Sequence, residues 1–205
     1  MSEPMGPSEP PRVSGVPGRL RGLAWPALAT AAVLAITVTQ LRYQGRLWWC
    51  ACGDWAIWWG DPRSSHNSQH PFDPYSFTHV LHGVVLCGVL AVVARRLAPA
   101  WRLWLAIALE SLWEVVENSE FVIDHYRNAT AMLGYQGDTI VNSLGDIASC
   151  VVGYLLARRL GPWRSLALLV VIEVVLLLWI RDSLLLEVVM LIHPIPGIKA
   201  WQTGG

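Results

Sequence analysis

Long apolar blocks alternate with short polar or basic connectors along most of the chain. The first 21 residues are instead rich in proline, serine and glycine, and such a segment buries too little apolar surface to order itself. Five later blocks are each about long enough to cross a bilayer as a helix. They cover about residues 22–40, 74–94, 100–122, 139–158 and 163–180. The pattern predicts a disordered tail over residues 1–21 and one integral membrane domain over residues 22–205, an all-α, polytopic bundle of about five transmembrane helices.

Start signals support several of these helices. Asp73 can cap the second helix, with Pro74 suited to its first position. Pro99 starts the third helix in the same way, and either Asp138 or Thr139 can cap the fourth. The prediction therefore includes the residues at which the second, third and fourth helices begin.

The remaining segments are expected to be connectors or surface elements. Residues 124–137 read as a connector between the third and fourth helices. The final apolar stretch, residues 184–192, is too short to span and carries Glu187, so we expect it in the interface or against the bundle. No small-x-small cleavage site follows the first apolar run, which favours an uncleaved anchor over a signal peptide.

Basic residues predict the orientation in the membrane. In the five-span scheme, nine of the 15 lysines and arginines lie on one side, in the tail and two short connectors. They are Arg12, Arg19, Arg21, Arg95, Arg96, Arg102, Arg158, Arg159 and Arg164. Because short cytoplasmic loops carry the excess of basic residues, the N-terminus should lie in the cytoplasm and the C-terminus outside.

Composition agrees with a membrane protein. The chain is 54% hydrophobic and only 15% charged, its mean hydropathy is +0.41 and its net charge is zero. These values exclude a nucleic-acid binder, a disordered protein and an ordinary cytosolic enzyme. Twelve tryptophans fit the same class, because Trp gathers at membrane interfaces and against lipid headgroups.

The third helix carries acidic residues where a membrane disfavours them. Glu110, Glu114 and Glu117 follow one another at i, i+4 and i+7, so they share one face, whereas Glu120 lies off that face and is expected to be solvated. Each ionisable group in hydrocarbon costs several kcal/mol and is a functional candidate. Three neighbouring carboxylates also repel, so they must share protons, a cation or a basic partner.

The second and fourth helices offer partners at matching depth. His79 and His82 lie one turn apart near the outer end of the second helix. Asp138, Asn142 and Asp146 follow at i, i+4 and i+8 on the fourth. With a rise of about 1.5 Å per residue, all of these side chains lie in the outward half of the membrane.

This combination of imidazoles and carboxylates suits a divalent metal such as Zn, Mn or Fe. The predicted metal ligands are His79, His82, Glu117 and Asp138. The predicted catalytic residues are Glu114 and Asp146, and Glu110 and Asn142 complete the polar cluster. Such a site could act on a lipid-linked or envelope substrate by metal-assisted or acid–base-assisted hydrolysis or group transfer.

The same residues also fit other functions, so the sequence leaves open whether the protein is an enzyme. The carboxylates could form the relay of a small proton-coupled transporter. They could equally lock the bundle of an assembly factor, with Asp138 only a cap and Asn142 only an interhelical hydrogen bond. Arg127 could neutralise one carboxylate, and Glu173 receives no partner. Substrate and oligomeric state do not follow from the sequence.

The loop before the second helix has its own candidates. Residues 65–70 are polar and carry two histidines, so they could form a lid over the cluster or an ordinary solvated loop. The loop's tryptophans should dock in the headgroup region. Cys50 and Cys52 are too close in sequence to form an easy disulfide with each other. Cys87 and Cys150 should be buried thiols.

Several runs of residues resemble a known family. The chain contains SQHPFDPYSFTHVLHG from residue 68, ESLWEVVENSEFVIDHYR from residue 110, YQGDTIVNSLGDI from residue 135 and PIPGIKAWQ from residue 194. From about Trp49 onward, their content and order resemble an uncharacterised family of bacterial inner-membrane proteins. The resemblance implies a multi-pass protein of the bacterial inner membrane and no particular reaction. Short helices with acidic outer ends also make the chain loosely similar to the VanZ-like membrane proteins.

Overall fold

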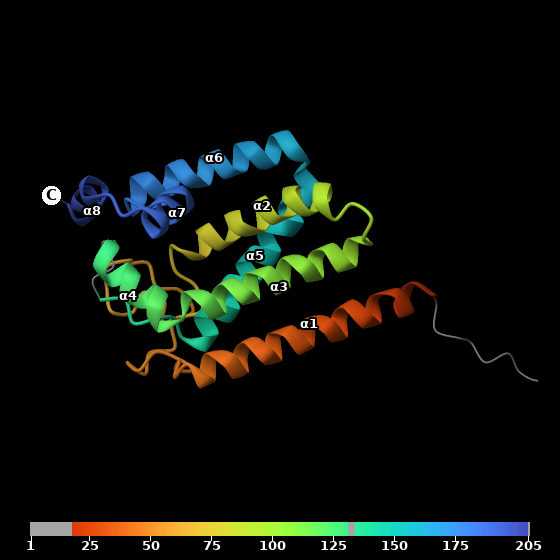
Figure 1. The fold of residues 1–205 in the computed structure, drawn as a ribbon, viewed down its shortest axis with the longest axis horizontal. Helices are drawn as coiled ribbons and strands as arrows, with labels where there is room; N and C mark the ends of the chain where they lie inside the picture. The colour runs from red at the N-terminus through yellow and green to blue at the C-terminus, as the bar shows by residue number, and fades with distance from the viewer. Residues whose placement is uncertain (1–17, 131–133, 205) are drawn as a thin grey trace, which may run out of the picture.

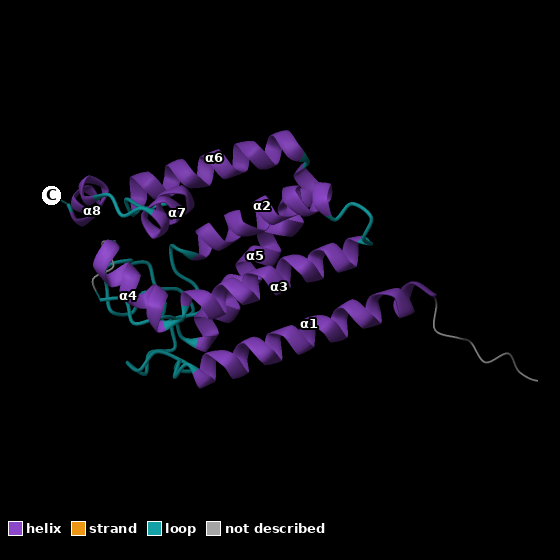
Figure 2. Ribbon diagram, in the orientation of Figure 1, coloured by secondary structure: helices purple, strands orange, loops and turns teal. Residues whose placement is uncertain are grey.

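The computed structural model describes residues 18–130 and 134–204, and these ranges form eight helices without a β-strand (Figure 2). The helices are α1 (Gly18–Tyr43), α2 (Ser76–Val93), α3 (Pro99–Glu117), α4 (Glu120–Ala129), α5 (Ile140–Leu160), α6 (Pro162–Trp179), α7 (Leu184–Ile192) and α8 (Pro196–Thr203). The expected all-α bundle is confirmed. Most of the proline-rich tail, residues 1–17, lies outside the described residues, and α1 begins before the predicted end of that tail.

Four helices are long and apolar enough to cross a membrane, namely α1, α2, α5 and α6. The chain is therefore an all-α polytopic helix bundle. Helix α3 has a similar length and lies beside them (Figure 1), but it carries one arginine and three glutamates. Its role as a fifth span, and the cytoplasmic N-terminus, remain predictions.

The long helices are arranged side by side, with α1 and α6 at opposite edges and α2, α3 and α5 between them (Figure 1). Helices α2 and α5 cross very closely because glycines lie at the crossing. A methyl group on Gly83 would overlap the carbonyl oxygen of Cys150, and one on Gly153 would overlap that of Val80. Small residues of this kind let two helix backbones approach each other in a membrane. The polar loop, α4, α7 and α8 gather at one end of the bundle.

The third helix ends earlier than expected. It stops at Glu117 instead of near residue 122, and the chain turns at Asn118. The Ser119 side chain then accepts a hydrogen bond from the amide of Val122 and caps a new helix, α4. The expectation of a connector over residues 124–137 was therefore wrong in its first part. Helix α8 was also not predicted, whereas α7 covers the stretch expected over residues 184–192.

The start signals had mixed outcomes. Thr139 caps α5 by accepting from the amide of Asn142, so Thr139 and not Asp138 is the cap. Pro99 does lie in the first turn of α3. Helix α2 begins at Ser76, later than expected, because Asp73 accepts from the amides of Ser68 and Tyr75 and holds a turn before the helix.

Candidate functional site

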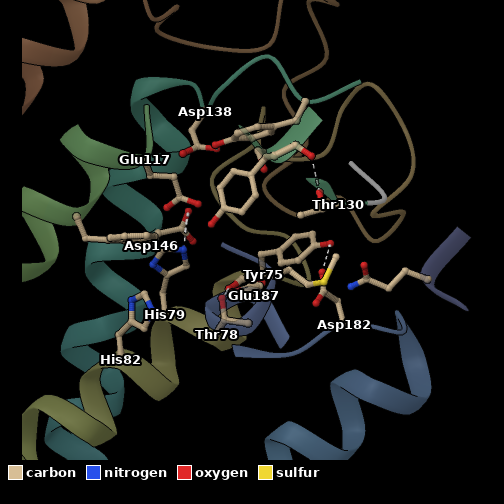
Figure 3. A pocket seen from close by; sticks show the side chains of 16 residues that line it. Tyr75, Thr78, His79, His82, Glu117, Thr130, Asp138, Asp146, Asp182 and Glu187 are labelled. Carbon is tan, nitrogen blue, oxygen red and sulfur yellow. Dashed lines mark hydrogen bonds and ion pairs between the residues drawn. The ribbon is translucent and has the colours of Figure 1, made fainter. Parts of the chain in front are cut away.

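A small polar cavity lies at the end of the bundle where the loop and short helices gather (Figure 3). Its volume is about 30 Å³, which is room for an ion or a water molecule or two. Helix α2 contributes His79 and His82, α3 contributes Glu117, α5 contributes Asp146 and α7 contributes Glu187. With Tyr126 of α4 and Gln202 of α8, the cavity therefore collects side chains from six helices and from the loops between them.

His79 lies at the centre of the acidic groups. Its Nδ1–H donates to Glu110 Oε1 at 2.6 Å, and the same nitrogen is 3.4 Å from Glu114 Oε1. On the other side of the ring, Nε2 is 3.9 Å from Asp146 Oδ2. The helices thus present these groups at the same depth, as predicted, and His79 lies within reach of carboxylates from both α3 and α5.

Glu110 holds both histidines. His82 Nδ1 is 3.0 Å from Oε1 and 3.1 Å from Oε2 of the same carboxylate, which is almost completely buried. The imidazoles of His79 and His82 meet edge to face, with ring centroids 4.9 Å apart. Glu110 is therefore saturated with partners and fixes the orientation of the two rings.

Glu114 differs from Glu110 in its hydrogen bonding. Its side chain is fully buried, yet neither carboxylate oxygen has a hydrogen-bond partner among the residues that the structure describes. Glu117 Oε2 is also buried without such a partner within the same ranges. One donor atom from each of His79, Glu114 and Glu117 lies within 4.8 Å of the others, and a second such group consists of His79, His82 and Glu110. Buried carboxylate oxygens without donors call for a cation or a proton.

Asp138 lines the same cavity and has a complete set of hydrogen bonds. Asn118 Nδ2 donates to its Oδ2 at 2.7 Å, the Asp138 amide donates back to Asn118 Oδ1 at 2.7 Å, and Tyr135 donates to its Oδ1 at 2.9 Å. Burial raises the pKa of Asp138 above its ordinary value, and these donors oppose that shift. Asp138 belongs to neither of the two ligand groups that include His79.

The predicted residues on α5 have different surroundings. Asp146 Oδ1 accepts from the hydroxyl of Ser76 at 3.0 Å, and its carboxylate faces His79 in the cavity. The amide of Asn142 donates instead to the backbone carbonyl of His70 at 2.8 Å. Asn142 therefore holds the loop against α5, while Asp146 belongs to the cluster.

The loop covers this end of the bundle and is partly buried. The Thr139 amide donates to the Ser68 carbonyl at 3.0 Å, and Gln69 Nε2 donates to the Gly137 carbonyl at 2.9 Å. Ser68 itself lines the cavity. Among the two loop alternatives, the structure favours a cover over the cluster.

Several contributors were absent from the sequence prediction. Asn118 follows Glu114 by four residues, so the helical stripe could have included it. Tyr75, Asp182 and Glu187 form a further polar group at the α7 side of the cavity, where Tyr75 donates to Asp182 at 3.3 Å. Burial raises the pKa of Asp182 to about 6. No helical spacing links these three residues.

The other charged candidates lie outside the cluster. Arg127 pairs with Asp124 at 3.3 Å on the surface and donates to the Tyr135 carbonyl, so it neutralises none of the cluster carboxylates. Glu173 accepts from the amide of Leu185 at the start of α7. Glu120 is exposed, as expected.

The structure places the cysteines in two settings. It joins Cys50 to Cys52 in a disulfide, with Cα atoms 5.3 Å apart, so the expectation against this bond was wrong. The two residues reach each other because the loop turns sharply between them. Cys87 and Cys150 are free thiols, half-buried and buried respectively.

Comparisons with known proteins give a family without an activity. The family model described as "Protein of unknown function (DUF2585)" matches residues 41–204. The chain is 42% identical over 177 residues to a UPF0314 protein of Paracoccus denitrificans, covering 86% of this chain and 92% of that protein. It is 41% identical over 182 residues to a UPF0314 protein of Sphingopyxis alaskensis, covering 87% and 95%. No solved structure matches the chain.

Proposed function

Since the chain belongs to the DUF2585 family, whose description carries no activity, we propose a function from the site itself. The protein is an enzyme of the bacterial inner membrane that binds a divalent metal at His79, Glu114 and Glu117. It hydrolyses, or transfers a group from, a lipid-linked or envelope substrate. The likeness to VanZ-like proteins remains an expectation from architecture alone.

The buried carboxylate of Glu114 is the observation that carries this proposal. An ionised carboxylate without donors in a low-dielectric site is expensive, and a divalent cation beside His79 would satisfy it. Imidazole and carboxylate ligands suit Zn, Mn and Fe. Glu110 supports the site from behind, because its hydrogen bonds fix the orientation of the His79 and His82 rings.

The remaining residues have roles in the reaction. A water molecule fits the cavity, and Asp146 lies on the Nε2 side of His79, where it can accept a proton from that water. The water oxygen bonds to the electrophilic phosphorus or acyl carbon, and the bond to the leaving oxygen breaks. The proton then passes from Asp146 to that leaving oxygen. Because the cavity has room only for the ion and the attacking water, the scissile group of the substrate approaches its edge.

The residues on the far side of Glu110 from the cavity favour an enzyme over a transporter. There α2, α3, α5 and α6 line an apolar groove of about 710 Å³, and the charged residues among its described lining are Arg102 and Arg158. Among the residues that line this groove, no carboxylate continues the polar cluster. A proton relay would need such groups along its path.

Metal analysis of the detergent-purified protein tests the proposal. Purification without chelator should retain a metal, and Glu114→Gln should lower the metal content by about one equivalent while keeping the fold. Glu120→Gln is the matched control, because Glu120 is an exposed glutamate near the same helix end and should leave the content unchanged. The double variant His79→Ala/His82→Ala should lose the same equivalent.

Activity is tested separately by incubating the protein with a bacterial polar lipid extract and following lipid cleavage by mass spectrometry. Wild type should release product and Asp146→Asn should not. If Glu114→Gln keeps the full metal content, the metal site is wrong. If the metal is present but the lipids stay intact, the hydrolytic role on lipids is wrong.

A further inference from the structure

A second cluster of metal-ligating side chains lies in the loop between α1 and α2, outside the cavity described above. One donor atom from each of Cys50, Cys52, His66 and His70 lies within 4.8 Å of the others. The pattern is Cys-x-Cys followed by His-x-x-x-His, two sulfur and two nitrogen donors. Tetrahedral sites with this donor set are typical of structural zinc.

His70 is arranged as a metal ligand. Its imidazole is completely buried, and Nδ1–H donates to the carbonyl of Ala56 at 2.8 Å. This hydrogen bond fixes the tautomer and leaves the lone pair on Nε2 free. That buried Nε2 has no hydrogen-bond partner in the described part of the chain. A backbone carbonyl on one nitrogen and an open second nitrogen are the usual surroundings of a zinc-bound histidine.

Neighbouring groups hold the other ligands in place. His66 Nδ1 lies 3.4 Å from Cys50 Sγ, and the Trp59 ring packs on both imidazoles, with centroids 4.4 Å from that of His66 and 5.1 Å from that of His70. The stacked indole restricts rotation of both rings.

The sulfur atoms also receive backbone donors. The Cys52 amide donates to Cys50 Sγ at 3.3 Å, and the Asp54 amide donates to Cys52 Sγ at 3.4 Å. Such N–H donors favour the charged form of a thiol, because a thiolate is the better acceptor.

The geometry points to a structural Zn²⁺ site formed by Cys50, Cys52, His66 and His70 in the dithiol form of the protein. Each thiol releases one proton as its thiolate binds the ion, and no electrons are transferred. The disulfide between Cys50 and Cys52 is the alternative state of the same pair, and it removes both sulfur ligands.

The site fastens the cover of the cavity. The carbonyl of His70 accepts from Asn142 on α5, and Ser68, two residues earlier, lines the cavity. Zinc bound at His70 would therefore fix the segment that closes the intramembrane cluster. This role does not depend on whether the cluster is an active site.

The test uses the full chain in detergent, prepared with a phosphine reductant and without chelator. Zinc content is measured by mass spectrometry, and Co²⁺ replaces zinc as a spectroscopic probe, since thiolate ligands give charge-transfer bands and tetrahedral coordination gives intense visible bands. The wild type should bind about one equivalent of zinc at this site. Cys50→Ser and His66→Gln should lose this equivalent, whereas Glu114→Gln should keep it. Cys87→Ser is the matched control, because Cys87 is a free cysteine on α2, and it should keep the zinc.

Alkylation of the wild type tests the site without any variant. Cys52 is exposed, so its thiol should react quickly with N-ethylmaleimide once a zinc chelator is added, and slowly before. Equal alkylation with and without chelator would overturn the proposal. The proposal is also overturned if the protein shows no Co²⁺ bands after its Cys50–Cys52 disulfide has been reduced. Loss of metal in Glu114→Gln alone concerns the cavity site, so the two proposals fail separately.

Discussion

Replacement of Asn118 should destabilise the fold strongly, because its side chain is buried and hydrogen-bonded on both sides. It is fully buried at the break between α3 and α4, where its amide group forms a reciprocal pair with Asp138. Asn118→Ala removes the donor to the carboxylate and the acceptor of the Asp138 amide in one step. Tyr135 remains as a donor to the carboxylate, so Asp138 loses part and not all of its support.

The size of the effect follows from these contacts. A hydrogen bond to a charged group contributes about 1.5–3 kcal/mol, and a buried amide left without an acceptor costs about 1–3 kcal/mol. Together they give a loss of about 4 kcal/mol in unfolding free energy. For a chain of this length, about 2–4 °C of Tm corresponds to each kcal/mol, so Tm should fall by about 10 °C.

Thermal unfolding in detergent, followed by circular dichroism, measures this change. Asn128→Ala is the matched control, because Asn128 is exposed and donates only to the Asp124 carbonyl within α4. Its Tm should remain within about 2 °C of wild type. If Asn118→Ala melts as the control does, the pairing with Asp138 does not stabilise the fold and the reasoning is refuted.

Two further predictions follow from the same structure. Gly83→Ala should lower Tm by several degrees, because the added methyl group meets the α5 backbone. Gly88→Ala on the same helix should be neutral or stabilising, because nothing lies within 4 Å of the added methyl group. Equal Tm values for the two variants would contradict the close crossing of α2 and α5. Burial raises the pKa of Asp73 from its ordinary value of 3.8 to about 6, so the folded state holds the proton more tightly and this residue's stabilising contribution should be full below pH 3.8 and lost as the pH rises through 6. Melting between pH 3.5 and 7 should show a smaller decline in Asp73→Asn than in wild type or in the exposed control Asp61→Asn, and parallel profiles would contradict the assignment.

Helical periodicity was sufficient to predict much of the cluster. The spacing of Glu110, Glu114 and Glu117 defined one face, and the rise per residue placed His79 at their height. The structure brings these side chains together because both rules act within single helices, where geometry is regular. The assignment of roles among them is still a prediction.

The loops and short helices could not be predicted in this way. Asn118 and Ser119 end α3 because a local cap competes with continuation of the helix, and the apolar pattern does not record that competition. Likewise, Tyr75 and Asp182 meet only through the packing of α7 against the bundle. The approach of Cys50 to His66 depends on a loop fold that has no periodic signature.

The pairing of α2 with α5 also has a consequence in time. Ser76 and Asp146, which share a hydrogen bond, are 70 residues apart in the chain. At about 5–20 residues per second, a ribosome needs roughly 4–14 s to make that interval. During this period His79 and His82 of α2 have no α5 to pack against, and the glutamates of α3 join them first. The ionisable side chains of α2 and α3 are therefore made before their final neighbour exists, so the complete cluster can form only after α5 has been synthesised.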